Sequence, residues 1–150
     1  MTSPERASTS DPDLGALFAR ILPRLAELEG PILQDVGLSM WEYAIVTELA
    51  TGQALSQADL SKRTRRDPTR LGRHLDDLEG RSLITREAAD DKRQRTVTLT
   101  RAGRAAYRTA KKRIRRIEDE LLAEALTPAQ SASLRRGLAR LADVDRKSVV

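Results

Sequence analysis

Cysteine is absent from this sequence of 150 residues, and histidine and aromatic residues are scarce: one His, one Phe, one Trp and two Tyr. Without cysteine the chain has no disulfide, no thiolate metal site and no thiol-based redox sensor. A transition-metal sensor is not expected with a single histidine, and no cofactor is indicated. The core must be built from Leu, Ile, Val and Ala, a composition that favours an all-helical protein.

Long apolar runs are also missing from the sequence. No run approaches the ~18 residues of a membrane span, and no apolar segment follows a basic start as it would in a secretory signal. We therefore expect a cytoplasmic protein without a membrane partner. A nucleophile elbow with Ser, His and Asp, a phosphate-binding glycine loop and a cluster of metal ligands are absent as well. An enzyme is therefore not expected.

Charge is unevenly distributed along the chain, although the net charge is only +5. Residues 62–116 contain 19 Lys and Arg against 7 Asp and Glu, a balance of +12, whereas the rest of the chain has a balance of −7. Segregation of this kind indicates a polyanionic partner for the basic part. A generally charged, arginine-rich composition is the alternative explanation.

The N-terminal segment of residues 1–10 is rich in Ser, Thr and Pro, and we expect a disordered tail there. Asp11 or Asp13 then caps a helix whose apolar residues recur at helical spacing. These residues are Leu14, Leu17, Phe18, Ile21, Leu25 and Leu28. Pro23 should kink this helix, and Gly30-Pro31 should break or bend it before a further turn at residues 32–36.

Capping residues predict the starts of the remaining helices. The starts are Ser39 with Glu42, Ser56, Asp67 with Pro68, Thr100, and Thr127 with Gln130. The helix after Ser39 should run to about Ala50 with Tyr43, Val46, Leu49 and Ala50 inward. The helix after Pro68 places three leucines on one face, and the helix after Thr100 should reach about Ala125. The short helices after Ser56 and Asp67 together form a helix-turn-helix.

Two short segments of strand-type composition, residues 84–87 and 96–99, surround a charged tip at residues 90–95. A basic hairpin beside a basic helix is the layout of a winged helix-turn-helix. The expected fold class is therefore mainly α, a winged helix-turn-helix with a two-strand β-wing.

With these elements in this order, the chain resembles the MarR family of bacterial transcription regulators over about residues 13 to 143. Four segments carry the resemblance: Leu38-Ser39 with Glu42-Tyr43 and Ile45-Val46; Leu55 to Leu60; Leu71 to Leu83; and Asp91-Lys92-Arg93 with Val97 to Thr100 and Gly103. Ser82 departs from the family's glycine before Leu83, and Pro23 and Pro31 are unusual in a long first helix. The resemblance implies a DNA-binding lobe at residues 37–100, and a helical dimerisation region at residues 11–36 and 101–145.

In this arrangement the helix after Pro68 enters the major groove and the wing lies along the minor groove of double-stranded DNA. The recognition-helix candidates are Pro68, Thr69, Arg70, Arg73 and His74. The wing candidates are Asp91, Lys92, Arg93 and Arg95, with Asp91 orienting Arg93 by a charge-assisted hydrogen bond. The candidates for backbone contacts are Ser56, Gln57, Arg63, Arg65 and Arg66. Plain solvated charge is the alternative for the arginines, and a surface or packing role for His74.

Specific regulators of this kind bind palindromic half-sites as homodimers, and the resemblance implies that the first and last helices interlock. Interface candidates are Leu14, Leu17, Ile21, Ile117, Leu121, Leu134, Leu138 and Leu141. An intramolecular bundle is the alternative. Relatives are released from DNA by small, often phenolic or anionic, molecules, and a site for such an effector is expected to include Phe18, Arg20, Leu22, Trp41 and Tyr43. These five residues are equally compatible with core or surface positions.

The sequence thus predicts a homodimeric transcription regulator, a repressor rather than an activator, that recognises palindromic operator DNA. A non-specific architectural DNA-binding protein is the main alternative. A dimeric sensor that has lost DNA binding is a third reading, which the intact wing motif opposes.

Overall fold

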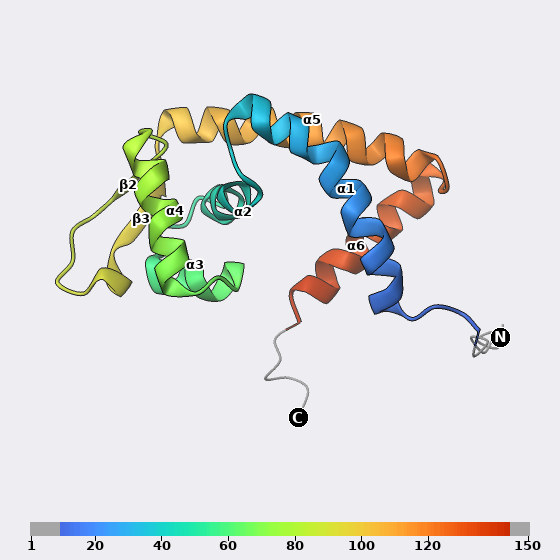
Figure 1. Cartoon of the computed structure of the whole chain (residues 1–150), viewed down its shortest axis with the longest axis horizontal. Helices are drawn as coiled ribbons and strands as arrows, with labels where there is room; N and C mark the ends of the chain where they lie inside the picture. The colour runs from blue at the N-terminus through green and yellow to red at the C-terminus, as the bar shows by residue number, and fades with distance from the viewer. Residues whose placement is uncertain (1–9, 145–150) are drawn as a thin grey trace.

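The computed structural model describes residues 10–144, which form six α-helices and a small sheet (Figure 1). Residues 1–9 of the disordered tail expected at residues 1–10, and residue 145 of the expected dimerisation region, lie outside the described residues. The helices are α1 (Leu14–Val36), α2 (Met40–Leu49), α3 (Gln57–Thr64), α4 (Pro68–Gly80), α5 (Arg101–Ala123) and α6 (Pro128–Ala142). The strands are β1 (Leu55–Ser56), β2 (Ile84–Arg86) and β3 (Thr96–Leu99).

Helix α1 runs without interruption through both of its prolines, Pro23 and Pro31. The side chain of Asp13 caps it by accepting a hydrogen bond from the backbone N–H of Ala16 at 2.9 Å, as expected. Of the expected break or bend at Gly30-Pro31, the break is wrong, because the helix ends only at Gly37, whose φ of 80° closes it with a left-handed residue. Ile32 and Leu33, which directly follow Pro31, are buried, and their burial stabilises the last turns of the helix.

Local capping defines the starts of the other helices, as the sequence predicts. Ser39 and Glu42 form a reciprocal capping box at α2, and Thr127 and Gln130 form another at α6. Asp67 caps α4 in front of Pro68 at the first helical position, where a missing backbone N–H costs nothing. Each cap satisfies backbone donors that a helix start leaves without a partner.

The two strands expected for the wing, β2 and β3, pair antiparallel, and a third strand, β1, extends the sheet in the order β1-β3-β2. The additional strand β1 consists of two residues only, with Leu55 opposite Val97 of β3. A strand of two residues shows no alternation that a sequence pattern could reveal. On the other side of β3, Ile84 of β2 lies opposite Leu99.

The buried core lies mostly in the lobe formed by α2, α3, α4 and the sheet. Its most deeply buried large side chains are Ile45, Val46, Leu60, Leu71, Leu75, Leu78, Ile84 and Val97. The three leucines of α4 are therefore inward, as predicted. The predicted inner face of α2 is partly wrong, because Ile45, which was not included, is buried, whereas Tyr43 and Ala50 are only half-buried.

One charged residue of α2, Glu42, is buried among these side chains. Its carboxylate caps the helix and also forms an ion pair with Arg81, which follows α4 and donates to the carbonyl oxygen of Gly37. Arg81 therefore joins α4 to the start of α2 and the end of α1, and its guanidinium compensates the buried charge.

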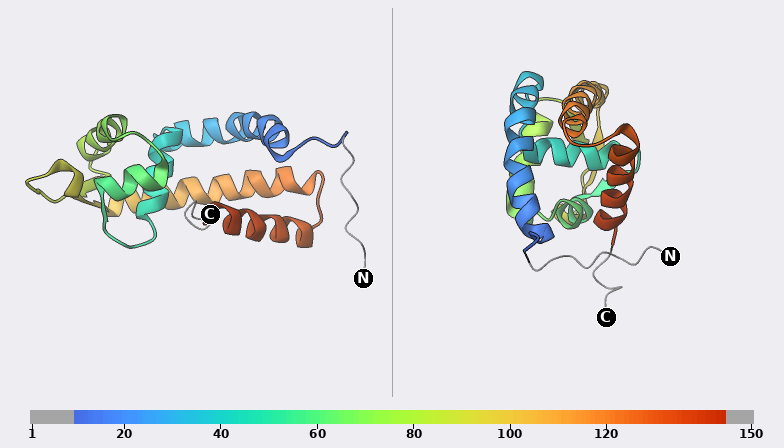
Figure 2. Two further views of the ribbon diagram at one scale, coloured as in Figure 1. Left: turned by 90° about the horizontal axis from the view of Figure 1, so that it is seen from below. Right: turned by 90° about the vertical axis from the view of Figure 1, so that its right-hand side faces the viewer.

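The molecule is elongated because α5 extends from the sheet to the far end, with α1 alongside it in the opposite direction (Figure 1). Helix α6 folds back along α5 (Figure 2). Large apolar side chains of α1 and α6 are exposed in the single chain, among them Leu14, Ile21, Leu134, Leu138 and Leu141. No helix within residues 10–144 combines the length and apolar character that crossing a membrane requires.

Candidate nucleic-acid interface

The outer face of α4 presents polar residues at the start of the helix, while its leucines face the core. Thr69, Arg70 and Arg73 are exposed there, next to Pro68. The Asp67 side chain accepts a hydrogen bond from the backbone N–H of Arg70, and its other oxygen lies 3.5 Å from Nε of Arg70. The hydrogen bond from this N–H, with the nearby positive charge, lowers the pKa of Asp67. Asp67 therefore stays ionised and fixes the helix start.

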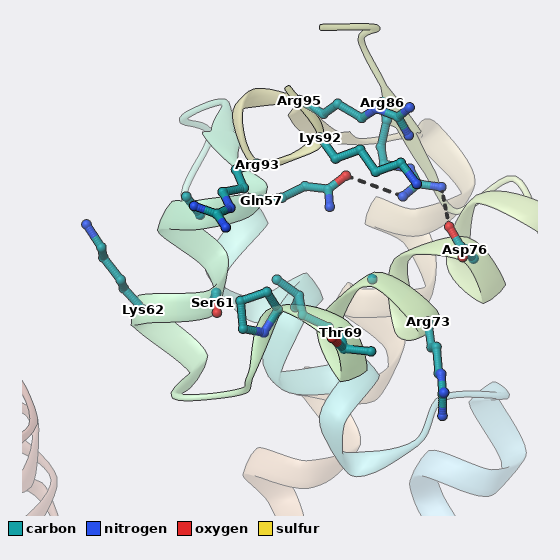
Figure 3. A pocket seen from close by; sticks show the side chains of 14 residues that line it. Gln57, Ser61, Lys62, Thr69, Arg73, Asp76, Arg86, Lys92, Arg93 and Arg95 are labelled. Atoms are coloured by element: carbon teal, nitrogen blue, oxygen red, sulfur yellow. Dashed lines mark hydrogen bonds and ion pairs between the residues drawn. The ribbon is translucent and has the colours of Figure 1, made fainter. Parts of the chain in front are cut away.

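A hollow of about 560 Å³ separates α3 and the start of α4 from the tip of the wing. Its charged lining consists of Lys62, Arg73, Arg86, Lys92, Arg93 and Arg95, with Asp76 as the one acid among the lining residues (Figure 3). Thr69 and Arg73 come from α4, on the side away from Lys92 and Arg95 of the wing. Cations gathered around one concave surface raise the positive potential there, which attracts a polyanion, and the side chains of Lys62 and Arg73 extend outward from it (Figure 3).

The wing tip is a short 3₁₀ turn, Lys92–Gln94, that Asp91 caps. An Asp91 carboxylate oxygen accepts a hydrogen bond from the backbone N–H of Arg93 at 3.0 Å. Asp91 was expected to bind the side chain of Arg93, but the hydrogen bond comes from the backbone of Arg93. The Arg93 side chain is exposed and lines the hollow. The backbone N–H of Gln57, at the start of α3, donates to the carbonyl oxygen of Arg95 at 3.0 Å and ties the tip to the helix.

Arg86 is a site residue that the sequence reasoning missed. Its side chain is only 9% exposed, and its guanidinium reaches two acids of α4 and one amide of α3. The ion pair with Glu79 is the first cause that raises the pKa of Arg86, and the same pair lowers the pKa of Glu79. Strand alternation offered a signal, because Arg86 lies two residues after buried Ile84 and so on the same face of β2.

Four of the five backbone-contact candidates already have partners within the chain, and the side chain of one of them, Gln57, accepts a hydrogen bond from Arg86. The Ser56 hydroxyl accepts from the backbone N–H of Asp59, and Arg63 lies 3.5 Å from Glu48. Arg66 lies over the ring of Trp41, with Cζ 4.0 Å from the ring centroid. Arg65, by contrast, is exposed and has a left-handed backbone with a φ of 53°.

His74 is half-buried in α4, with its Nε2 3.4 Å from a guanidinium nitrogen of Arg66. Nε of Arg66 is buried without a hydrogen-bond partner among the described residues. Trp41, Arg66 and His74 therefore form one cluster that supports the turn between α3 and α4. The packing alternative for His74 is the one this geometry favours.

The five effector-site candidates do not gather at one site in this single chain. Arg20 and Leu22 are exposed on α1 and Trp41 lies against Arg66, whereas Tyr43 stacks on Tyr107 of α5 with centroids 6.1 Å apart. Burial and the neighbouring Tyr107 raise the pKa of Tyr43 to about 12. Within residues 10–144, no group of three or more His, Asp or Glu side chains is arranged to hold a metal ion.

The dimer candidates divide into two groups by exposure. Leu14, Ile21, Leu134, Leu138 and Leu141 are exposed, whereas Leu17, Ile117 and Leu121 are half-buried between the helices of the same chain. The exposed group covers α1 and α6 at the end of the molecule away from the wing. An exposed apolar surface of this kind is typical of a protein interface.

Comparisons with known proteins agree with this architecture. Residues 36–94 match the model of the MarR family. The chain is 33% identical over 88 residues to an uncharacterized HTH-type transcriptional regulator, YdgJ, of Bacillus subtilis, a match that covers 58% of this chain and 54% of that one, about half its length. It is 29% identical over 132 residues to the HTH-type transcriptional repressor Rv2887 of Mycobacterium tuberculosis, covering 87% of this chain and 94% of the relative.

Solved structures extend the similarity to nearly the whole fold. A MarR-family transcriptional regulator from Rhodococcus sp. RHA1 superposes with a TM-score of 0.78 at 24% identity, covering 91% of this chain and 96% of that one. Rv2887 in complex with DNA superposes with a TM-score of 0.72 at 27% identity, covering 87% and 98%. The DNA-binding lobe thus matches the MarR family of transcription regulators, and the whole fold is similar to that of solved members of this family.

Proposed function

We propose that the chain is a homodimeric repressor that recognises palindromic operator DNA through the hollow between α4 and the wing. The observation that carries the proposal is the position of Arg73 and Arg93, which line the same hollow from the recognition helix and from the wing. The relative Rv2887 is a transcriptional repressor and has been solved in complex with DNA, which supports the assignment. A protein acting on bacterial promoters works where the chromosome lies, so the proposal places it in the cytoplasm.

The recognition helix α4 is proposed to enter the major groove, where Arg70 and Arg73 each donate two hydrogen bonds to guanine O6 and N7. The side chain of Thr69 lies next to these arginines and is suited to a base or a phosphate. Asp67 holds this helix start by its capping bond. The arginines supply base recognition, and the helix start supplies position along the duplex.

The wing is proposed to lie along the adjacent minor groove. Arg93 projects from a turn that Asp91 holds in shape, and a narrow minor groove concentrates the negative potential that attracts arginine. Lys92, Arg95, Arg63 and Arg65 are proposed as phosphate contacts, each adding to affinity without adding sequence preference. Because Arg66 and His74 contact each other inside the lobe, their proposed part is to hold the turn between α3 and α4.

Two copies of the lobe are needed because one recognition helix covers few base pairs. The exposed apolar residues of α1 and α6 are proposed to pair two chains about a two-fold axis, with residues 37–100 as the DNA-binding lobe of each. The dimer then contacts half-sites about one helical turn apart. An architectural DNA-binding protein is the other candidate, favoured only by the many phosphate-type cations.

A small aromatic or anionic effector is proposed to release the dimer from DNA. The support comes from Rv2887, which has been solved in complex with salicylic acid and superposes with a TM-score of 0.69 at 28% identity. Such a molecule must bind the DNA-incompetent conformation more tightly than the competent one. The proposed site lies between the dimerisation helices and the DNA-binding lobe. Its candidates stay Phe18, Arg20, Leu22, Trp41 and Tyr43, which do not gather at one place within a single chain.

Sequencing of genomic fragments retained by the purified protein tests the proposal, because it yields the operator and its half-site spacing together. We expect a palindrome with half-sites about one helical turn apart, and a solution mass of two chains. Retention of fragments without a common sequence would favour the architectural protein. A solution mass of one chain, with or without DNA, would contradict the homodimer.

A further inference from the structure

The guanidinium of Arg86 connects three elements of the DNA-binding lobe. Its Nε and one terminal nitrogen donate to the two carboxylate oxygens of Glu79 at 3.2 and 3.1 Å, a forked pair with α4. The same terminal nitrogen donates to Asp76 at 2.6 Å, and the other donates to Gln57 of α3 at 3.3 Å. Figure 3 shows Arg86 between Gln57 and Asp76.

An arginine at this position needs an explanation beyond surface charge. Arg86 shares the inner face of β2 with buried Ile84, a place where an apolar residue would extend the core. An inward charge on an edge strand opposes pairing between molecules, but that purpose requires no partners on two helices. Planar guanidinium groups give bidentate bonds with fixed geometry, which a flexible ammonium does not.

We propose that Arg86 is a positioning residue that locks the wing at a fixed distance from the recognition helix, so that one rigid surface meets two adjacent grooves. Arg86 touches no nucleic acid in this role and acts through Arg93 on one side and Arg73 on the other. Gln57 extends the lock, because its backbone N–H holds the carbonyl of Arg95 beyond the tip. This inference rests on the proposed DNA-binding function and concerns how its two contact sets are coupled.

A rigid lock has a specific energetic consequence. If the wing and α4 are held at the spacing of the grooves before binding, contacts made by one reinforce contacts made by the other. Without the lock, the wing must be ordered during binding, and its contribution falls. The energetic effect of removing Arg93 should therefore depend on Arg86, which a double-mutant cycle measures.

The test compares the loss of operator affinity caused by Arg93→Ala in the wild-type and Arg86→Gln proteins, both as the full chain. We expect the loss to be about tenfold in the wild type and less than about threefold with Arg86→Gln. The control is Arg81→Gln, because Arg81 also ties α4 to neighbouring elements, Glu42 and Gly37, but not to the wing. The Arg93→Ala loss should keep its full size in that background.

A second measurement needs no DNA. Because the chain lacks cysteine, Gln94→Cys and Asp77→Cys introduce unique attachment points for two spin labels, one at the wing tip and one on α4. The distance distribution between the labels should broaden with Arg86→Gln and stay unchanged with Arg81→Gln. If Arg86→Gln does not fold, Glu79→Gln removes the forked pair from a side chain that is 43% exposed, and both measurements are read on it.

An Arg93→Ala loss that keeps its full size without the lock, or an unchanged distance distribution, overturns the inference. If Arg86 only stabilised the fold, the Arg86 and Arg81 variants would both have a lower melting temperature. They would then not differ in the Arg93→Ala loss of affinity or in the distance distribution. Failure of the wild type to prefer any operator would instead overturn the proposed function. The spin-label distances would still decide whether Arg86 holds the wing.

Discussion

The carbonyl oxygen of Leu83 lies against Gly103, in the space that a β-carbon on that glycine would occupy. Leu83 lies in the short connection from the recognition helix α4 to β2, and Gly103 is in the first turn of α5. The same carbonyl accepts a hydrogen bond from the backbone N–H of Thr100 at 3.1 Å, so the two segments are held together. The exit from α4 and the start of the long helix therefore approach as closely as backbone allows, which only glycine permits.

Gly103→Ala is expected to destabilise the fold at the upper end of, or beyond, the roughly 1–3 kcal/mol that overpacking costs, because backbone cannot move as a side chain can. Chemical denaturation measures the change. Gly72→Ala is the matched control, since a β-carbon there meets nothing within 4 Å inside α4 and should stabilise by about 0.5–1 kcal/mol. Equal effects of the two substitutions would show that the contact with Leu83 is absent.

Ser82→Gly is expected to stabilise the protein by up to about 1 kcal/mol, because Ser82 has a left-handed backbone with a φ of 60°. Its backbone N–H and carbonyl bonds to Glu79 and Thr100 would remain. Ser133→Gly, on an exposed helical position of α6, should have the opposite sign. A loss of stability for both variants, measured by denaturation, would contradict the strained geometry at Ser82.

Much of this geometry was readable from local sequence. The caps at Ser39, Asp67 and Thr100 act within four residues, so the starts of α2, α4 and α5 follow from the chain alone. Ser82 stands out in the sequence only as a departure from the family's glycine, and its left-handed backbone, with a φ of 60°, is a finding of the structure.

Other features depend on partners far along the chain. Glu42 is buried because Arg81, 39 residues later, supplies its counter-charge. The side chain of Arg86 donates a hydrogen bond to Gln57, 29 residues earlier. Helix α1 continues past Gly30 because Ile32 and Leu33 enter the core, where tertiary packing outweighs local preference. Periodicity alone contains none of this information.

Glu29→Gln is expected to raise the melting temperature at neutral pH. Burial, and then the nearby Glu118, raise the pKa of Glu29 above its ordinary value of 4.5, so the ionised form is disfavoured in the folded chain. Below 4.5 both the folded and unfolded states hold the proton, and the gain should vanish there. It should grow as the pH rises from 4.5 to the folded pKa and stay constant above it.

Melting curves at several pH values measure this gain. Exposed Glu27, two residues away on the same helix, provides the control substitution Glu27→Gln. A gain for Glu29→Gln that is the same at low and neutral pH would point to a cause other than ionisation.

Arg93→Ala is expected to weaken operator binding by about tenfold, and most on sites with AT-rich flanks, because a narrow minor groove has the stronger negative potential. Fluorescence anisotropy with matched AT-rich and GC-rich flanks measures the difference. Lys92→Ala, one residue earlier on the exposed tip, should lose affinity equally on both flanks. An equal loss for Arg93→Ala would make it a simple phosphate contact.

The central claim, sequence-specific recognition by α4, is tested most directly by a competition titration of the wild type and Arg73→Ala against the operator and random duplex. The wild type should prefer the operator by a factor of about 10³ or more. Arg73→Ala should lose ~1–3 kcal/mol of binding free energy on the operator and little on random duplex, so that the ratio of operator affinity to random-duplex affinity falls. Unchanged affinities of Arg73→Ala for both duplexes would contradict the placement of α4 in the major groove.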